Sequence, residues 1–345
     1  MEYEKKKNIS KIISLIYLFF SLLILSYIIF RTEYYNLSYW YYKKYLIIIF
    51  FLIVFSLVSF YFSLKFKVNL SLTVISVILP IYLMEGLLTF NKWNNRIGDK
   101  RSYTQVYKDL KKDNKFILPT IPPSAFVNFK LKDYFPVSLI PNYEVINCNE
   151  NGEYIVNKND RYGFNTNDKT WEEEEIDYIL LGDSFTYGYC EKAENNISGN
   201  LKKIHNSKTN IINLGMPGNG PLISYVALKE YYPKNKNIKN ILWFFYPNDM
   251  SDLNKEIHNE VLGKYLSDPF FKQNLKNDNN LQKQIYLDYV YKRYEVSKLS
   301  FLRLNNLKNF FSNIKNQKEN FANEKNLTTL KKIIHMSSEI DIKAK

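Results

Sequence analysis

The chain has 345 residues and a formal net charge of +13, with 47 Lys and Arg residues against 34 Asp and Glu residues. The lysines are scattered among asparagines without a stacked-aromatic platform or a recognition-helix pattern, so the charge does not predict nucleic-acid binding. The sequence also lacks zinc-type Cys/His spacing and a glycine-rich phosphate loop, and we therefore expect no cofactor.

Three apolar stretches near the N-terminus predict transmembrane helices over residues 12–30, 45–64 and 68–90. Each stretch matches a bilayer core of ~30 Å at about 1.5 Å per helical residue. Residues 1–90 are therefore predicted to form a membrane module that contacts the lipid bilayer. Glu85, near the end of the third stretch, is interpreted as a solvated carboxylate at the membrane interface.

The orientation of this module is predicted from its basic residues. Lys5, Lys6 and Lys7 precede the first stretch, and the first span usually decides the topology, so we expect the N-terminus inside the cell. Three spans then place the following domain outside. The chain is predicted to be a multi-pass protein of the cytoplasmic membrane with an extracytoplasmic domain.

Residues 91–141 are predicted to be a linking segment with a short helix near residues 103–112. An α/β domain is predicted over residues 142–345. Its strands are apolar runs, which alternate with helical stretches over residues 191–204 and 222–232; the runs cover residues 176–181, 211–215 and 241–246. This alternation implies a parallel sheet covered by helices on both faces.

Each predicted strand leads into a turn that carries a small or polar residue. Gly182, Asp183 and Ser184 follow the first strand, Gly215 ends the second, and Asn248 follows the third. The carboxyl ends of parallel strands meet at one sheet edge, where ligands bind in open α/β folds. A serine at a helix start suits a nucleophile, because nearby N–H groups can hold an oxyanion. A Gly-Asp-Ser sequence alone is equally well an ordinary turn.

Together these blocks resemble the SGNH or GDSL-type hydrolase superfamily, and above all its membrane-anchored bacterial members. The resemblance covers residues 149–253 and includes the segment 160–165, Asp-Arg-Tyr-Gly-Phe-Asn. It implies a three-layer α/β fold with Ser184 as the nucleophile. It further implies an oxyanion hole formed by the Ser184 N–H, the Gly215 N–H and the Asn248 side chain. Tyr246 stands where the third block usually has a glycine.

The fourth block of the superfamily, which carries a general-base histidine three residues after an aspartate, has no counterpart in the sequence. A serine hydroxyl is a poor nucleophile without a base. His205, His258 and His335 are interpreted as surface residues, and His258 is the nearest substitute. An amphipathic helix is predicted over residues 328–338, and a further strand should start at residues 340–345. We therefore expect a fragment or truncated product that lacks the last strand or two and the catalytic histidine.

The resemblance implies an esterase or acyltransferase that acts through a Ser184 acyl-enzyme on acylated carbohydrate or lipid of the cell envelope. The alternative is a non-catalytic binding module without its base. The chain as given is expected to show negligible turnover. Residues 252–321 are predicted to form a helical insertion over the sheet edge, where substrate choice could be set.

The two cysteines, Cys148 and Cys190, both fall near the predicted site. Outside the membrane they could form a disulfide across roughly forty residues. Two unrelated thiols remain the alternative, because the sequence does not establish the Cα separation that a disulfide requires.

Overall fold

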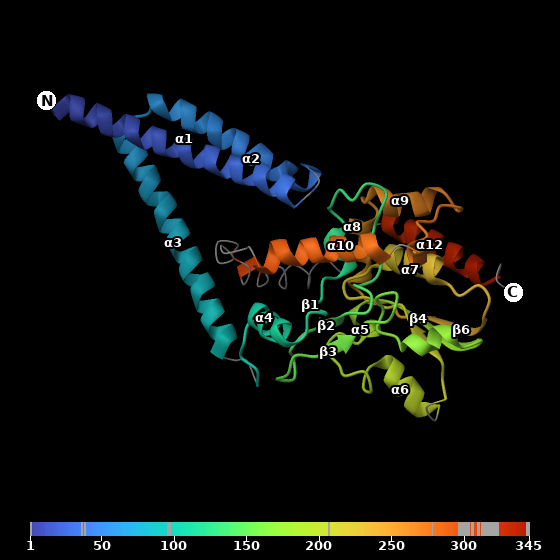
Figure 1. Cartoon of the computed structure of the whole chain (residues 1–345). Coiled ribbons are helices and arrows are strands. Elements are labelled where there is room, and N and C mark those ends of the chain that lie inside the picture. Colours follow the sequence, from blue (N-terminus) through green and yellow to red (C-terminus); the bar gives the residue numbers. More distant parts are fainter. Residues whose placement is uncertain are drawn as a thin grey trace. The chain divides into compact units, whose positions relative to one another are not determined.

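The computed structural model describes most of the chain, and the remaining residues are drawn as a grey trace in Figure 1. The described residues are 2–35, 37, 39–94, 98–205, 208–277, 279–295, 304, 307, 308, 311 and 324–342. The chain divides into two compact units. The first comprises Met1–Asn94, Asn128–Lys130 and Leu299–Ile314, and the second comprises Asn95–Val127, Leu131–Lys298 and Lys315–Lys345.

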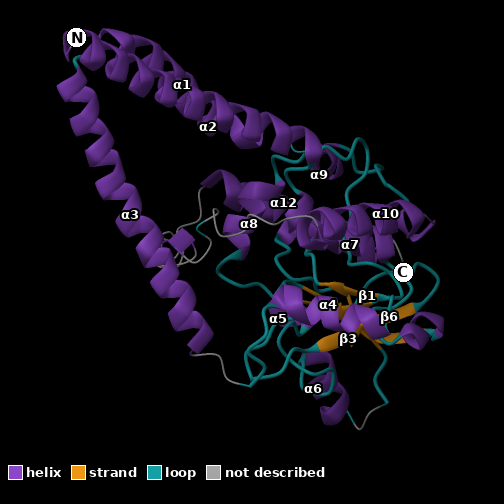
Figure 2. Ribbon diagram, turned by 60° about the vertical axis from the view of Figure 1, so that its left-hand side comes forward, coloured by secondary structure: helices purple, strands orange, loops and turns teal. Residues whose placement is uncertain are grey.

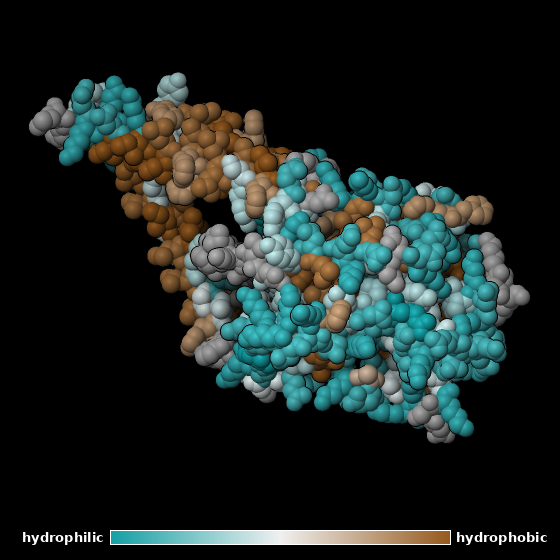
Figure 3. Space-filling view, viewed as in Figure 1, coloured by the Kyte–Doolittle hydropathy of each residue, from teal (hydrophilic) through white to brown (hydrophobic). Residues whose placement is uncertain are grey.

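The first unit is built on three long helices, α1 (Glu2–Tyr34), α2 (Tyr39–Val58) and α3 (Leu64–Asn94). Within the described residues, three helices are long and apolar enough to cross a membrane, and they correspond to these elements. Apolar residues cover most of the visible surface of these helices, and hydrophilic residues gather at the N-terminal end of α1 (Figure 3). The prediction of three apolar helices that could span a membrane is confirmed, although the helices extend beyond the predicted ranges at most of their ends.

Small polar side chains join α1 to α2, as in many membrane helix pairs. The Ser21 and Ser56 hydroxyl oxygens lie 3.1 Å apart. Glu85 on α3 is only 9 % exposed, and its Oε2 accepts a hydrogen bond from the Leu307 N–H at 2.7 Å. The interpretation of Glu85 as a solvated carboxylate is therefore wrong, because its side chain is buried and accepts a hydrogen bond from the Leu307 backbone.

The second unit contains a small mixed sheet formed by β1 (Ile117–Pro119), β2 (Glu144–Ile146) and β3 (Val156–Lys158). Strands β1 and β2 are parallel, and β3 pairs with β2 in the antiparallel direction. The helix α4 (Tyr103–Asp113) precedes β1 and begins with a capping box at Ser102. From Asn95 on, apart from Asn128–Lys130, the predicted linking segment 91–141 falls in the second unit. Strands of three residues are too short to be recognised from their periodicity.

A second sheet contains β4 (Glu175–Leu181), β5 (Ile211–Asn213) and β6 (Asn237–Trp243) in the order β5-β4-β6. Both neighbours of β4 run parallel to it, which confirms the predicted parallel sheet. The third strand is shifted toward the N-terminus relative to the prediction. Residues 244–246 consequently follow the strand instead of ending it.

Helices cover both faces of this parallel sheet. Figures 1 and 2 show α6 (Ile197–Ile204) on one face, and α7 (Pro221–Tyr231) with α12 (Glu324–Ile342) on the other. Every residue of α7 is buried, because this helix packs between the sheet and outer helices, among them α8 (Asp249–Glu256) and α9 (Glu260–Ser267).

The C-terminal third differs from the prediction at the end of the chain. Residues 340–342, where a further strand was expected to start, form the last turn of α12. Within its described residues, the predicted insertion, residues 252–321, contains the end of α8, then α9 and α10 (Asn279–Val290), with irregular segments between them. Most of residues 296–321 lie outside the described residues.

Candidate active site

A tight turn after β4 places Ser184 at the start of the short helix α5 (Ser184–Tyr187). Gly182 has a φ of 149°, and a Cβ there would lie 2.2 Å from Thr186 Oγ1, so this turn requires glycine. The Asp183 carboxylate accepts the Phe185 N–H at 3.0 Å and caps the helix. Ser184 is half-buried, and within the described part of the chain its hydroxyl has no hydrogen-bond partner.

The loop after β5 brings Gly215 against α5. The Met216 N–H donates to the Gly182 carbonyl at 3.1 Å, which joins this loop to the serine turn. A Cβ on Gly215 would lie 2.7 Å from the Thr186 side chain, so the close approach requires glycine. The Gly215 N–H, an expected oxyanion donor, donates instead to Asn213 Oδ1 at 2.9 Å. This donor is therefore engaged within the protein.

Asn248 lies in the loop between β6 and α8, and it is exposed. Its side-chain amide donates to Asp252 Oδ2 at 3.1 Å. Burial raises the pKa of Asp183, and a hydrogen bond from the Asn248 amide opposes that rise. Asn248 thus lies beside the residue that precedes Ser184. The structure brings Ser184, Gly215 and Asn248 to one sheet edge. The Gly215 N–H and the Asn248 amide are, however, bonded to Asn213 and Asp252.

An acidic cluster, which sequence reasoning missed, accompanies these residues. Asp249 is only 2 % exposed, and its Oδ2 accepts the Tyr246 N–H at 2.9 Å. Its Oδ1 has no hydrogen-bond partner within the described residues. Burial, with the nearby charges of Asp183 and Asp252, raises the pKa of Asp249 to about 7. Ionised carboxylates here oppose an additional negative charge, such as an oxyanion.

Exposed aromatic rings form a rim beside the serine turn. The Phe185 and Tyr246 rings stack with their centroids 4.4 Å apart. Phe185 is 57 % exposed, and Phe244, Phe245 and Tyr246 are 36 %, 48 % and 46 % exposed. The rim exists because β6 ends at Trp243, so three large apolar residues leave the sheet. The sequence alone had placed these residues inside a strand.

None of the three histidines, all of which are described, hydrogen-bonds to Ser184. His205 Nε2 lies 3.3 Å from the Tyr178 hydroxyl, and His258 Nδ1 lies 2.7 Å from the Asn254 carbonyl oxygen. His335 lies 3.5 Å from Glu339, one turn further along α12. All three side chains are exposed. The described residues therefore supply no histidine base for the serine hydroxyl.

The segment 160–165, which formed part of the family resemblance, supports the site from behind. The Asp160 carboxylate accepts the Phe164 N–H at 2.8 Å and the Trp171 Nε1–H at 2.7 Å. Burial raises the pKa of Asp160 to about 6. The Asn165 amide donates to the Tyr187 carbonyl at 2.8 Å and so holds the end of α5. The segment positions the serine helix without reaching Ser184.

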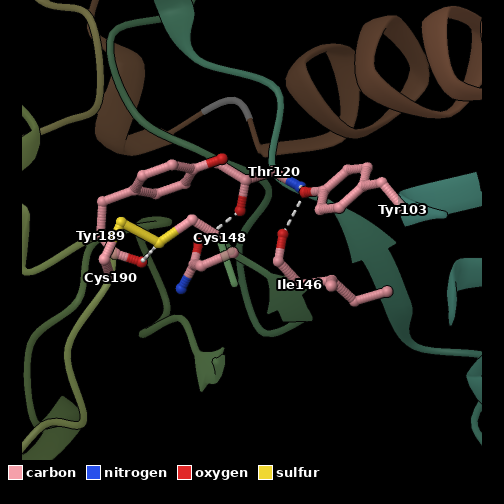
Figure 4. The surroundings of a disulfide bond; sticks show 7 residues. Tyr103, Thr120, Ile146, Cys148, Tyr189 and Cys190 are labelled. Atoms are coloured by element: carbon pink, nitrogen blue, oxygen red, sulfur yellow. Dashed lines mark hydrogen bonds between the residues drawn. A yellow bond between two sulfur atoms is a disulfide. The ribbon is translucent and has the colours of Figure 1, made fainter. Parts of the chain in front are cut away.

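A disulfide joins Cys148 and Cys190, with a Cα–Cα distance of 5.2 Å and a sequence separation of 42 residues (Figure 4). Cys148 follows β2, and Cys190 lies six residues after Ser184. On the β2 side, the Tyr103 hydroxyl accepts the Thr120 N–H at 2.8 Å and donates to the Ile146 carbonyl. The disulfide therefore connects the mixed sheet to the loop that follows the serine helix.

Glu256, at the end of α8, holds the start of α7. Its carboxylate accepts the N–H groups of Gly220 at 2.6 Å and Leu222 at 2.9 Å. Anions are stabilised at a helix N-terminus, because its first N–H groups lack partners within the helix. The residue is 1 % exposed, and burial raises its pKa from an ordinary value of 4.5 to about 8. Nothing in the sequence pairs Glu256 with Gly220, which lies 36 residues away.

This raised pKa predicts a pH dependence of stability. Between about pH 4 and 8 the folded protein binds more protons at Glu256 than the unfolded chain does, so its unfolding free energy falls as pH rises. Glu256→Gln is expected to flatten the pH dependence of the thermal midpoint measured across that window. The exposed Glu260 provides a matched control, and Glu260→Gln should leave the curve parallel to wild type. Parallel curves for Glu256→Gln as well would contradict the prediction.

No protein-family model matches the chain, and neither a curated protein nor a solved structure matches it.

Proposed function

We propose that the chain has the architecture of a membrane-anchored serine hydrolase of the SGNH or GDSL type, with Ser184 as its nucleophile. One observation carries the proposal. Three loops at the carboxyl edge of one parallel sheet bring together Ser184, the glycine-dependent approach of Gly215, and Asn248, and among the described residues the Ser184 hydroxyl has no hydrogen-bond partner. That edge is where open α/β sheets bind their ligands.

In the proposed reaction, the Ser184 Oγ attacks an ester carbonyl and loses its proton to a base. The carbonyl oxygen becomes an oxyanion, which the Gly215 N–H and the Asn248 amide stabilise. Both donors must first leave Asn213 and Asp252, to which they are bonded. Catalytic hydrogen bonds commonly align only when substrate is present. The alcohol then departs, and the acyl group passes to water or to a sugar hydroxyl.

Acyl groups of envelope polysaccharide or lipid are the proposed substrates. The aromatic rim of Phe185, Phe244, Phe245 and Tyr246 supports this choice, because exposed rings beside a nucleophile suit the apolar part of an acyl group. The disulfide supports an extracytoplasmic site, since disulfides persist in oxidising compartments. The three apolar helices would hold the protein in the cytoplasmic membrane.

A second candidate function is a non-catalytic binding module that uses the same sheet edge. Two observations favour it: none of the three histidines, all of them described, hydrogen-bonds to Ser184, and the acidic cluster around Asp249 opposes an oxyanion. Such a module would bind acylated carbohydrate or lipid without turnover.

Covalent labelling distinguishes the two candidates. We expect the full chain in detergent to react weakly with a fluorophosphonate probe, because the serine stays protonated without a base. Added imidazole should supply the base and increase labelling, with the phosphonate found on Ser184 by peptide mass spectrometry. No Ser184 label at any imidazole concentration would favour the binding module. Strong labelling without imidazole that disappears in His258→Ala would identify His258 as the base.

A further inference from the structure

A cavity lies away from the serine turn and is built from other elements. It has a volume of about 380 Å³ and is lined by Phe116, Pro141, Asn142, Tyr143, Asn280 and Lys283. Phe116 immediately precedes β1, residues 141–143 precede β2, and Asn280 and Lys283 belong to the first turns of α10. It shares no residue with the loops that carry Ser184, Gly215 and Asn248.

Two aromatic rings form one side of this cavity. Phe116 is 59 % exposed and packs edge-on against Tyr143, with ring centroids 5.4 Å apart. Because the Phe116 ring is exposed, its face is available to a ligand in the cavity. The face of such a ring carries partial negative charge and therefore attracts the weakly positive C–H groups of a sugar ring.

The polar side chains of the cavity have no hydrogen-bond or ion-pair partner among the described residues, although the Lys283 ammonium lies near an aromatic ring. Within the described residues, the side chains of Asn142 and Asn280 form no hydrogen bond, and Lys283 forms no ion pair. The Lys283 ammonium lies 5.4 Å from the centroid of the Tyr143 ring. Polar groups that converge on a concave, partly apolar site are what fix the orientation of a small ligand.

Backbone hydrogen bonds hold together the segments around the cavity. Asn142 has a φ of 60°, a conformation that few non-glycine residues adopt, and its N–H donates to the Asp160 carbonyl at 2.9 Å. The Glu144 N–H donates to the Phe116 carbonyl at 2.8 Å. Glu144 directly follows the lining residue Tyr143 in the sequence. Its carboxylate accepts a hydrogen bond from the Asn114 amide at 3.0 Å and does not line the cavity.

We propose that this cavity binds an acidic sugar residue, such as a uronic acid. The pyranose ring would stack on Phe116, its hydroxyls would bond to Asn142 and Asn280, and its carboxylate would pair with Lys283. The positive end of α10 adds to the attraction for an anion. The inference does not depend on the chemistry of Ser184, because it concerns binding at a separate place.

The test uses the full chain in detergent micelles with methyl β-D-glucuronide as the probe and methyl β-D-glucoside as its neutral counterpart. Saturation-transfer difference NMR and a titration should show saturable binding that is stronger for the glucuronide. Lys283→Met is expected to weaken glucuronide binding about fivefold, the usual range for a partly exposed ion pair. Phe116→Ala should weaken both glycosides by a similar factor, about fivefold.

Two control variants separate the charge from general effects. Lys283→Arg keeps the charge and should retain most of the binding. Lys331→Met removes an exposed lysine from α12 that does not line the cavity, and it should bind like wild type. Absence of saturable binding, equal binding of the neutral glycoside, or unchanged affinity in Lys283→Met would overturn the proposal. Inorganic phosphate that binds as tightly as the glucuronide would overturn the sugar assignment.

Discussion

Replacing Ser184 with alanine is expected to abolish the imidazole-dependent hydrolysis of p-nitrophenyl butyrate. The hydroxyl would be the nucleophile of the proposed reaction, and alanine has no group that can replace it. The fold should survive, because the Ser184 hydroxyl has no hydrogen-bond partner within the described residues, so its removal leaves no buried group unpaired. Initial rates, corrected for hydrolysis by imidazole alone, and circular dichroism provide the measurements.

In the same assay, Asn248→Ala is expected to lower the rate by about 10²–10³, the usual effect of losing one oxyanion donor. Asn254→Ala serves as its control, since Asn254 is an exposed asparagine on the neighbouring turn of α8, and it should keep the full rate. Imidazole-dependent turnover that persists in Ser184→Ala would refute the nucleophile. A rate unchanged in Asn248→Ala would remove that residue from the oxyanion hole.

Loss of the disulfide is expected to lower the unfolding free energy by about 4 kcal/mol. The estimate follows from the loop entropy that the bond removes from the unfolded chain, for a separation of 42 residues between Cys148 and Cys190. Chemical denaturation of Cys148→Ser/Cys190→Ser beside wild type, both in the same detergent, measures the difference. A change below about 1 kcal/mol would show that the bond does not restrain the unfolded state.

The disulfide also tests the topology, because it requires an oxidising compartment. Protein extracted from membranes without reductant should show no thiol that reacts with an alkylating reagent. Quantitative alkylation of both cysteines would refute the bond in the cell. It would also weaken the proposed extracytoplasmic location of the second unit.

Local signals explain which elements could be predicted. The three apolar helices follow from unbroken apolar length, and the strands β4 and β5 follow from apolar runs that end in glycine turns. The start of α7 was predicted to within one residue, because a proline follows a glycine-rich loop there. β6 was displaced because its first half, around Lys239 and Asn240, is polar and exposed at a sheet edge. The mixed sheet was missed because its strands have three residues each.

The sequence by itself determined the residues that meet at the sheet edge. Because a parallel sheet brings the carboxyl ends of its strands to one edge, the sequence predicts that Ser184, Gly215 and Asn248 share that edge, whereas the strand order β5-β4-β6 that makes their strands adjacent came only from the structure. The hydrogen bonds of those residues were decided only by the tertiary structure. Gly215 bonds to Asn213, Asn248 bonds to Asp252, and Glu256 reaches across to Gly220. The periodicity of the sequence indicates which segments form strands and helices. The partner of a buried polar group depends instead on which segments pack around it.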